Sequence, residues 1–71
     1  MKEATELAAQ ATSEDPEVGL RAVAALRRLL ERLESLHVES ARTHGLSWQE
    51  IADELGVSKQ AVHKKHRRRL R

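Results

Sequence analysis

The sequence has no cysteine, one aromatic residue, one proline and three glycines. Without cysteine the chain cannot form a disulfide, a thiolate zinc site or a cysteine nucleophile, and it suits the reducing cytoplasm. Because Trp48 is the single aromatic residue, any core must be built from aliphatic side chains. Abundant Ala, Leu, Glu and Arg, with so little glycine and proline, predict an all-α fold.

Long apolar segments are also missing. No run approaches the ~20 residues that span a membrane, and the opening Met1-Lys2-Glu3 is not typical of a signal peptide. We therefore expect a cytoplasmic protein with no membrane partner. A chain of 71 residues forms one small domain, and domains of this size often gain stability from a second subunit. A cavity for a small-molecule effector is not expected in so short a chain.

Charge is divided unevenly along the chain. Residues 1–40 carry five Lys or Arg against eight Asp or Glu, whereas residues 41–71 carry eight against three. From Gly56 onward there are seven basic residues and no acidic one. Such a tail can be a solvated charge run, but on a defined motif it supplies the positive charge that phosphate binding requires.

The first half of the chain shows helical periodicity. A weak apolar stripe predicts a short helix within residues 1–13. Asp15 before Pro16 is a typical helix start, and Gly45 is a typical left-handed stop. These signals predict one long helix from Pro16 to His44. The weak stripe of the short helix consists of Ala4, Leu7, Ala8 and Ala11.

The long helix carries a stronger apolar stripe. Its positions 26, 29, 33 and 36 alternate between spacings of three and four residues, as in a helix that buries one side. The short helix before it offers one leucine and a few alanines, too little to cover this stripe. We therefore expect residues 1–40 to dimerise, since symmetric dimers are the commonest oligomers. The expected dimer interface is Val23, Leu26, Leu29, Leu30, Leu33 and Leu36.

The segment SWQEIADELGVSKQAVHKKH contains two helix-start signals. Ser47 and Glu50 match the capping box, and Leu46 and Ile51 match the hydrophobic staple around it. A helix should therefore begin at Trp48. The small side chain of Ala52 suits a second helix that crosses nearby.

The second start signal follows a glycine. Gly56 can adopt the positive φ that ends the first helix, and Ser58 can cap a last helix that begins at Lys59. Val57 and Val62 occupy the staple positions. Two short helices joined by a three-residue turn with glycine form a helix-turn-helix unit, although a plain helical corner is the alternative.

The chemistry of the last helix suits a DNA major groove. There Gln can bind adenine, and Arg or Lys can bind guanine. Phosphate contacts are expected from Arg42, Ser47, Trp48, Lys65, Arg68 and Arg69. For Trp48 two roles stay open, because its indole N–H could meet a phosphate or its ring could pack against a neighbouring helix end.

The segment GLSWQEIADELGVSKQAVHKK resembles the helix-turn-helix of bacterial regulators, in the version shared by sigma factor region four and many small DNA-binding proteins of high-GC bacteria. The resemblance covers about residues 42–70 and implies a three-helix core that begins with the end of the long helix. It also implies a regulator that binds specific sequences of double-stranded DNA and associates with the nucleoid. The family's base-reading positions fall on Ser58, Lys59, Gln60, His63, Lys64 and Arg67.

One position departs from the family's pattern. An apolar residue usually follows one turn after Val62, whereas this sequence has Lys65 and His66. Because Val62, His66 and Leu70 share a helical face, we expect His66 to take the packing role.

Other functions fit the sequence less well. His63 and His66, like His37 and His44, lack a carboxylate or cysteine at ligand spacing, and structural zinc usually has four ligands. Catalysis needs side chains that converge on a pocket, which one exposed helix cannot provide. We therefore expect no metal, no cofactor and no enzyme. The remaining rival is a protein-interaction module in which residues 41–71 bind a protein rather than DNA.

Overall fold

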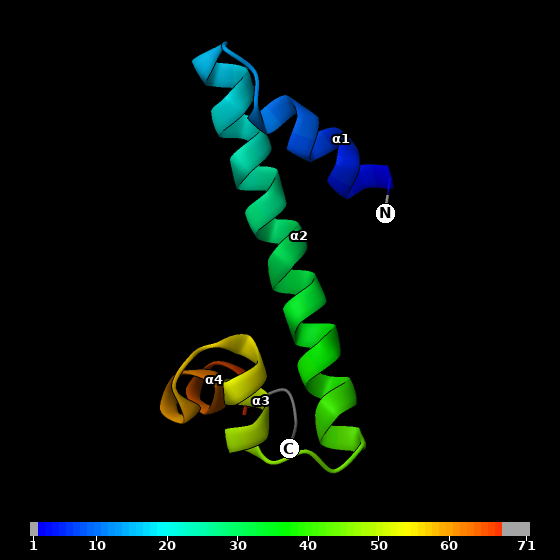
Figure 1. Ribbon diagram of the computed structural model, residues 1–71, viewed down its shortest axis with the longest axis vertical. Helices are drawn as coiled ribbons and strands as arrows, with labels where there is room; N and C mark the ends of the chain where they lie inside the picture. The colour runs from blue at the N-terminus through cyan, green and yellow to red at the C-terminus, as the bar shows by residue number, and fades with distance from the viewer. Residues whose placement is uncertain (1, 68–71) are drawn as a thin grey trace. The chain divides into compact units, whose positions relative to one another are not determined.

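The computed structural model describes residues 2–67, and these residues are helical with short connections (Figure 1). The predicted all-α class is confirmed, since no strand occurs in the described part of the chain. The chain divides within the longest helix into two compact units, Met1–Leu33 and Glu34–Arg71. The helices are α1 (Lys2–Ala11), α2 (Pro16–Thr43), α3 (Trp48–Leu55) and α4 (Lys59–His66).

Both ends of α2 follow the local signals. At its start the Asp15 carboxylate accepts hydrogen bonds from the backbone N–H of Glu17 at 2.9 Å and of Val18 at 3.4 Å. At its end Gly45 has φ 88°. The N–H of Gly45 donates to the Arg42 carbonyl and that of Leu46 to the Ala41 carbonyl, both at 3.0 Å, which is the Schellman pattern. The helix ends at Thr43, one residue before the predicted end.

The first unit contains α1 and the first half of α2. The end of α1 lies beside Gly19, because the carbonyl oxygens of Ala11 and Ser13 are within 4 Å of where a side chain there would begin. Glu3 and Arg32 form an exposed ion pair at 3.6 Å. Among the described residues of this unit, the buried side chains are those of Ala22 and Leu29.

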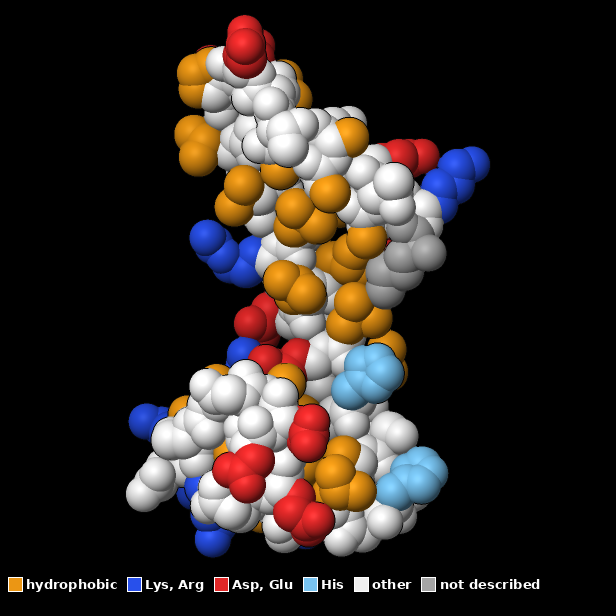
Figure 2. Space-filling model, in the orientation of Figure 1, with side chains coloured by type: hydrophobic (Ala, Val, Ile, Leu, Met, Phe, Trp, Pro, Cys, Tyr) orange, Lys and Arg blue, Asp and Glu red, His pale blue; other side chains and the backbone are white. Residues whose placement is uncertain are grey.

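The predicted leucine stripe is therefore divided between covered and open positions. Leu29 is buried and Leu26 and Leu33 are half-buried within the single chain. In contrast, Val23 and Leu30 stay exposed in this unit, as does Leu36 in the second. Figure 2 shows apolar side chains gathered on the visible face of α1 and the first half of α2.

The second unit packs α3 and α4 against the end of α2. Each of these three helices contributes at least one buried apolar residue to the core. Ala52 is 0% exposed, which confirms that a small residue stands in the most closely packed position. The core is Val38, Ile51, Ala52 and Val62, with Ala41, Leu46 and Trp48 packed around it.

The two predicted cap signals are present in the structure. The Ser47 hydroxyl accepts from the Glu50 N–H at 3.0 Å, while the Glu50 carboxylate accepts from the Ser47 N–H at 3.0 Å. Gly56 ends α3 with φ 71°, a conformation that side chains rarely adopt. The Ser58 hydroxyl then accepts from the Ala61 N–H at 3.1 Å. Two short helices are thus joined by residues 56–58, as the sequence predicts.

Candidate nucleic-acid interface

The helix α4 has two chemically different faces. Val62 and His66, four residues apart, are both 3% exposed and face the core. Gln60, Lys64 and Arg67 are exposed and follow the spacing i, i+4, i+7, which places them along one line of the helix. The packing role expected for His66 is confirmed. We call Gln60, Lys64 and Arg67 the α4 polar row.

The start of α4 places two further candidates near this row. Ser58 and Lys59 are exposed at the N-terminal end of the helix. The Ser58 oxygen already accepts the Ala61 N–H, so its hydroxyl proton is the part left for another partner. Lys59 carries its charge on a flexible stem and can reach a nearby anion.

His63 lies at the border of the polar row. Its ring is half-buried and meets the Trp48 ring edge to face, with 5.1 Å between centroids and 75° between planes. Such pairs stabilise a packed surface by about 0.5–1.5 kcal/mol beyond the buried area. His63 is therefore held by α3, which fixes where its polar edge can point.

Trp48 is also covered from a second side. The Arg42 guanidinium lies 4.8 Å from the ring centroid, and its Nη1 donates to the Leu46 carbonyl at 2.9 Å. Of the two roles left open for Trp48, packing is therefore what the structure shows. The remaining N–H groups of the exposed Arg42 stay available for an anion, since a guanidinium has five.

The other expected phosphate contacts are placed differently. The exposed Ser47 serves as the cap of α3, with both its backbone and hydroxyl engaged by Glu50. Lys65 is turned toward α2, where its Nζ lies 2.9 Å from the Glu34 carboxylate. Arg68 and Arg69 lie outside the described residues.

Glu34 is the residue that the sequence did not reveal. Its Oε2 also lies 2.9 Å from Nε2 of the buried His66, so one carboxylate oxygen ties two side chains of α4 to α2. An ionised carboxylate only accepts, so the His66 Nε2 carries the proton and donates. The Lys65 hydrogen bond, reinforced by His66 and opposed by partial burial, lowers the pKa of Glu34 below its usual 4.5.

This contact predicts a pH effect on stability. Because the folded-state pKa of Glu34 is depressed, its contribution is present above pH 4.5 and is lost as the pH falls through the folded-state value. Glu34→Gln should cost about 1 kcal/mol at pH 7 and should flatten the loss of stability below pH 4.5. Urea unfolding at a series of pH values measures both effects. Glu14→Gln, at an exposed position, is the control and should match wild type throughout.

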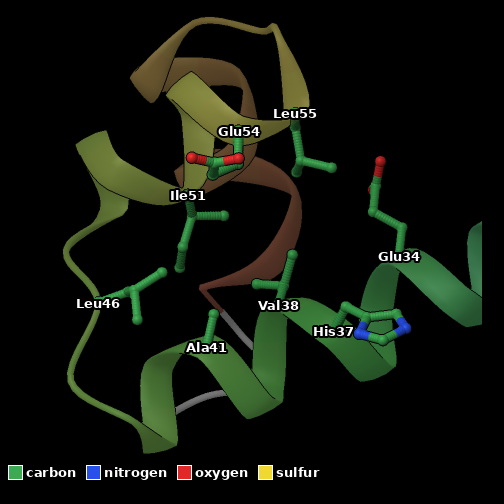
Figure 3. Close-up of a pocket in the computed structure, with 8 residues that line it drawn as sticks. All are labelled: Glu34, His37, Val38, Ala41, Leu46, Ile51, Glu54 and Leu55. Atoms are coloured by element: carbon green, nitrogen blue, oxygen red, sulfur yellow. The ribbon is translucent and has the colours of Figure 1, made fainter.

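An apolar hollow of about 220 Å³ lies between α2 and α3 (Figure 3). It is smaller than the roughly 300–1,000 Å³ of typical ligand pockets. We call it the α2–α3 groove. Its walls are Glu34, His37, Val38, Ala41, Leu46, Ile51, Glu54 and Leu55.

No group of three His, Cys, Asp or Glu side chains among residues 2–67 is arranged to hold a metal ion. Within the same residues, no helix combines the length and the apolar character needed to cross a membrane. Comparisons of the chain with protein-family models, with curated proteins and with solved structures found no match.

Proposed function

We propose that the protein is a homodimeric, non-enzymatic regulator of bacterial type that binds specific sequences of double-stranded DNA. In this proposal α3 and α4 act as a helix-turn-helix, with α3 as the support and α4 as the recognition helix. The observation that carries it is the α4 polar row, which is exposed while the opposite face of the same helix is fixed in a core by Val62 and His66. A row of this kind can enter a major groove without disturbing the fold.

The side chains of the row match the edges of bases. Gln60 can bind adenine through two hydrogen bonds, and Lys64 and Arg67 can bind guanine. Ser58 and Lys59 lie at the N-terminal end of α4, which would enter the major groove first. His63 would contact a base at the edge of the DNA site, since its contact with Trp48 limits how far its side chain can extend.

Phosphate contacts would flank this row. Arg42 is held in one direction by Trp48 and by the Leu46 carbonyl, which suits a fixed contact to the DNA backbone. Arg68 and Arg69 add positive charge after α4 in the sequence. Lys65 is left out of the proposed contacts because Glu34 neutralises it.

Dimerisation is the second part of the proposal. Exposed Val23 and Leu30 on the first half of α2, with Leu36 beyond them, give each chain apolar surface to cover. Two copies would present two α4 helices to one duplex. This matters because non-specific binding alone typically reaches only ~10⁻⁴–10⁻⁶ M at physiological salt.

The proposed docking predicts two kinds of mutant. Gln60→Ala should relax the preference at one or two base pairs by about 1–3 kcal/mol, because a bidentate base contact is lost. Arg68→Ala should weaken binding to every sequence alike, because a phosphate contact carries no sequence information. Titrations of a preferred and a random duplex measure the difference. Equal losses on both duplexes from both variants would show that α4 is not docked as proposed.

A protein-interaction module is the rival, and the α2–α3 groove is the observation that favours it. The salt dependence of duplex binding separates the two functions. DNA contacts release counterions, so the logarithm of affinity should fall linearly with the logarithm of salt, with a slope near −0.9 per phosphate contact. A flat dependence, or no duplex binding at all, would favour the module.

A further inference from the structure

Two apolar surfaces are exposed among residues 2–67. The first is a row on α2 formed by Leu20, Val23 and Leu30, which we call the α2 stripe; Leu20 is 70% and Leu30 64% exposed. The second is the α2–α3 groove of the second unit, where Leu55 is 41% exposed. Exposed large apolar side chains that gather in this way mark surfaces for a partner.

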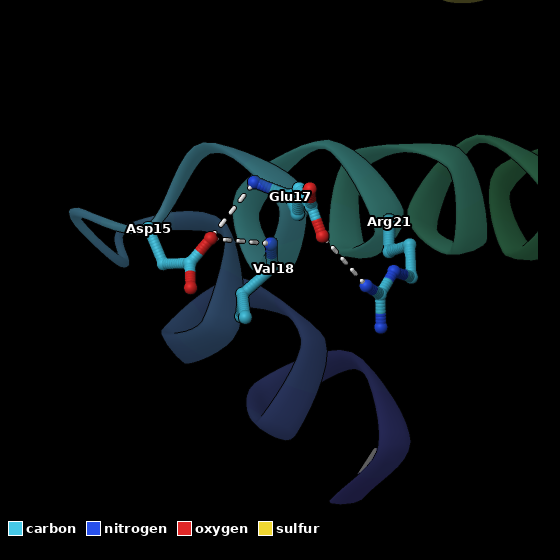
Figure 4. Close-up of polar contacts among 4 residues, drawn as sticks. All are labelled: Asp15, Glu17, Val18 and Arg21. Carbon is cyan, nitrogen blue, oxygen red and sulfur yellow. Dashed lines mark hydrogen bonds and ion pairs between the residues drawn. The ribbon is translucent and has the colours of Figure 1, made fainter.

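The segment that carries the stripe is basic. Residues 18–30 contain three arginines and no acidic residue. Arg27 lies four residues after Val23 and three before Leu30, so it shares their side of the helix. Arg21 already meets Glu17 at 3.4 Å (Figure 4), whereas Arg27 has no hydrogen bond or ion pair with a described residue.

The surroundings of the groove are acidic. The helix α3 carries Glu50, Asp53 and Glu54 and no basic residue. Glu50 is engaged in its capping box and Asp53 accepts a hydrogen bond from Gln49, but Glu54 has no partner among residues 2–67. Figure 2 shows acidic side chains beside an apolar patch on the second unit, and Figure 3 places Glu54 at the edge of the groove.

We propose that the α2–α3 groove is the docking site for the α2 stripe of a second copy of this chain. The leucines of one copy fill the apolar groove of the other, and Arg27 of that copy pairs with Glu54 at its edge. Both surfaces are apolar, and the charged residues beside them have opposite signs. Each surface is therefore a suitable partner for the other. This inference rests on the dimer of the proposed function. In place of an interface between two leucine stripes, the stripe of each copy contacts the groove of the other.

The proposed contact is reciprocal. A two-fold axis repeats every contact, so the stripe of each copy meets the groove of the other and two Arg27–Glu54 pairs form.

Charge exchange tests this contact. Arg27→Glu and Glu54→Arg should each raise the dimer dissociation constant about tenfold or more, because like charges then face each other. The double variant restores both pairs and should return to within about threefold of wild type. Sedimentation equilibrium of the full chain measures the constants, and circular dichroism checks that each variant remains helical.

Two controls carry the same charge changes at other exposed positions of α2. Arg28→Glu lies one residue along the helix and so points away from the stripe, and Glu39→Arg lies on α2 outside the groove. Both should dimerise like wild type. A wild type that sediments as a monomer at tens of micromolar, or single variants that dimerise normally, would overturn the inference.

The same variants separate this inference from DNA binding. If they become monomeric but bind a single half-site duplex like wild type, both the docking site and the proposed function are supported. If they stay dimeric and bind DNA, the docking site is wrong while the proposed function stands. If they become monomeric and neither they nor wild type bind any duplex, the docking site stands without the proposed function.

Discussion

Inserting about five base pairs between the two halves of the preferred DNA site should lower the affinity of the dimer about 10²–10⁴-fold. Two α4 helices that contact one side of a duplex must enter successive major grooves, about 34 Å apart. Half a helical turn carries the second half-site to the opposite side, so one helix loses its groove. The affinity gained from holding two helices together is then lost.

The measurement begins with selection of the preferred site from random duplexes, which should yield an inverted repeat. Anisotropy titrations then compare the selected site with its spaced version. The matched control carries the same inserted base pairs outside the repeat and should bind like the parent site. A footprint on a single half-site, indifferent to the insertion, would favour a monomer or the protein-interaction module.

Local signals predicted the helix ends in this chain. The caps at Asp15, Ser47 and Ser58 each involve backbone groups two or three residues away, so the sequence contains both partners. Gly45 and Gly56 act through their own φ. The end of α2 differed by one residue, because the Schellman bonds make His44 the C-cap, so that Thr43 is the last helical residue.

Contacts between distant segments were not predictable. Glu34 meets His66 across 32 residues of sequence, and nothing in the spacing of either residue indicates the other. The leucine stripe was predicted as one surface, but the structure buries Leu29 and exposes Leu30. Helical periodicity identifies an apolar side but not how much of it a neighbouring segment will cover.

The candidate site was predictable where it depends on the period of one helix. Val62 faces inward and Gln60 and Lys64 face outward because of their spacing alone. The contact between His63 and Trp48 depends on how α4 crosses α3, which spacing does not determine. The same holds for Lys65, whose direction is set by Glu34 on α2.

Replacing Ile51 with alanine should destabilise the second unit by about 2–5 kcal/mol, through lost burial and the cavity that remains. Ile51 is 4% exposed and belongs to a core of four buried apolar residues. Ile51 is the one large side chain that α3 buries fully, while Trp48 packs half-buried beside the core. Because a domain this small has only a few kcal/mol of net stability, most molecules should lose the α3–α4 arrangement.

Urea unfolding followed by circular dichroism measures this loss, and duplex titration measures its consequence. DNA affinity should fall in proportion to the folded fraction, since the α4 polar row is positioned only when α4 packs on its neighbours. Val18→Ala truncates an exposed apolar side chain of the first unit, outside the proposed dimer surfaces, and should change stability by no more than about 0.5 kcal/mol. If Ile51→Ala kept the wild-type unfolding midpoint and bound DNA normally, the core of the second unit could not be what positions α4.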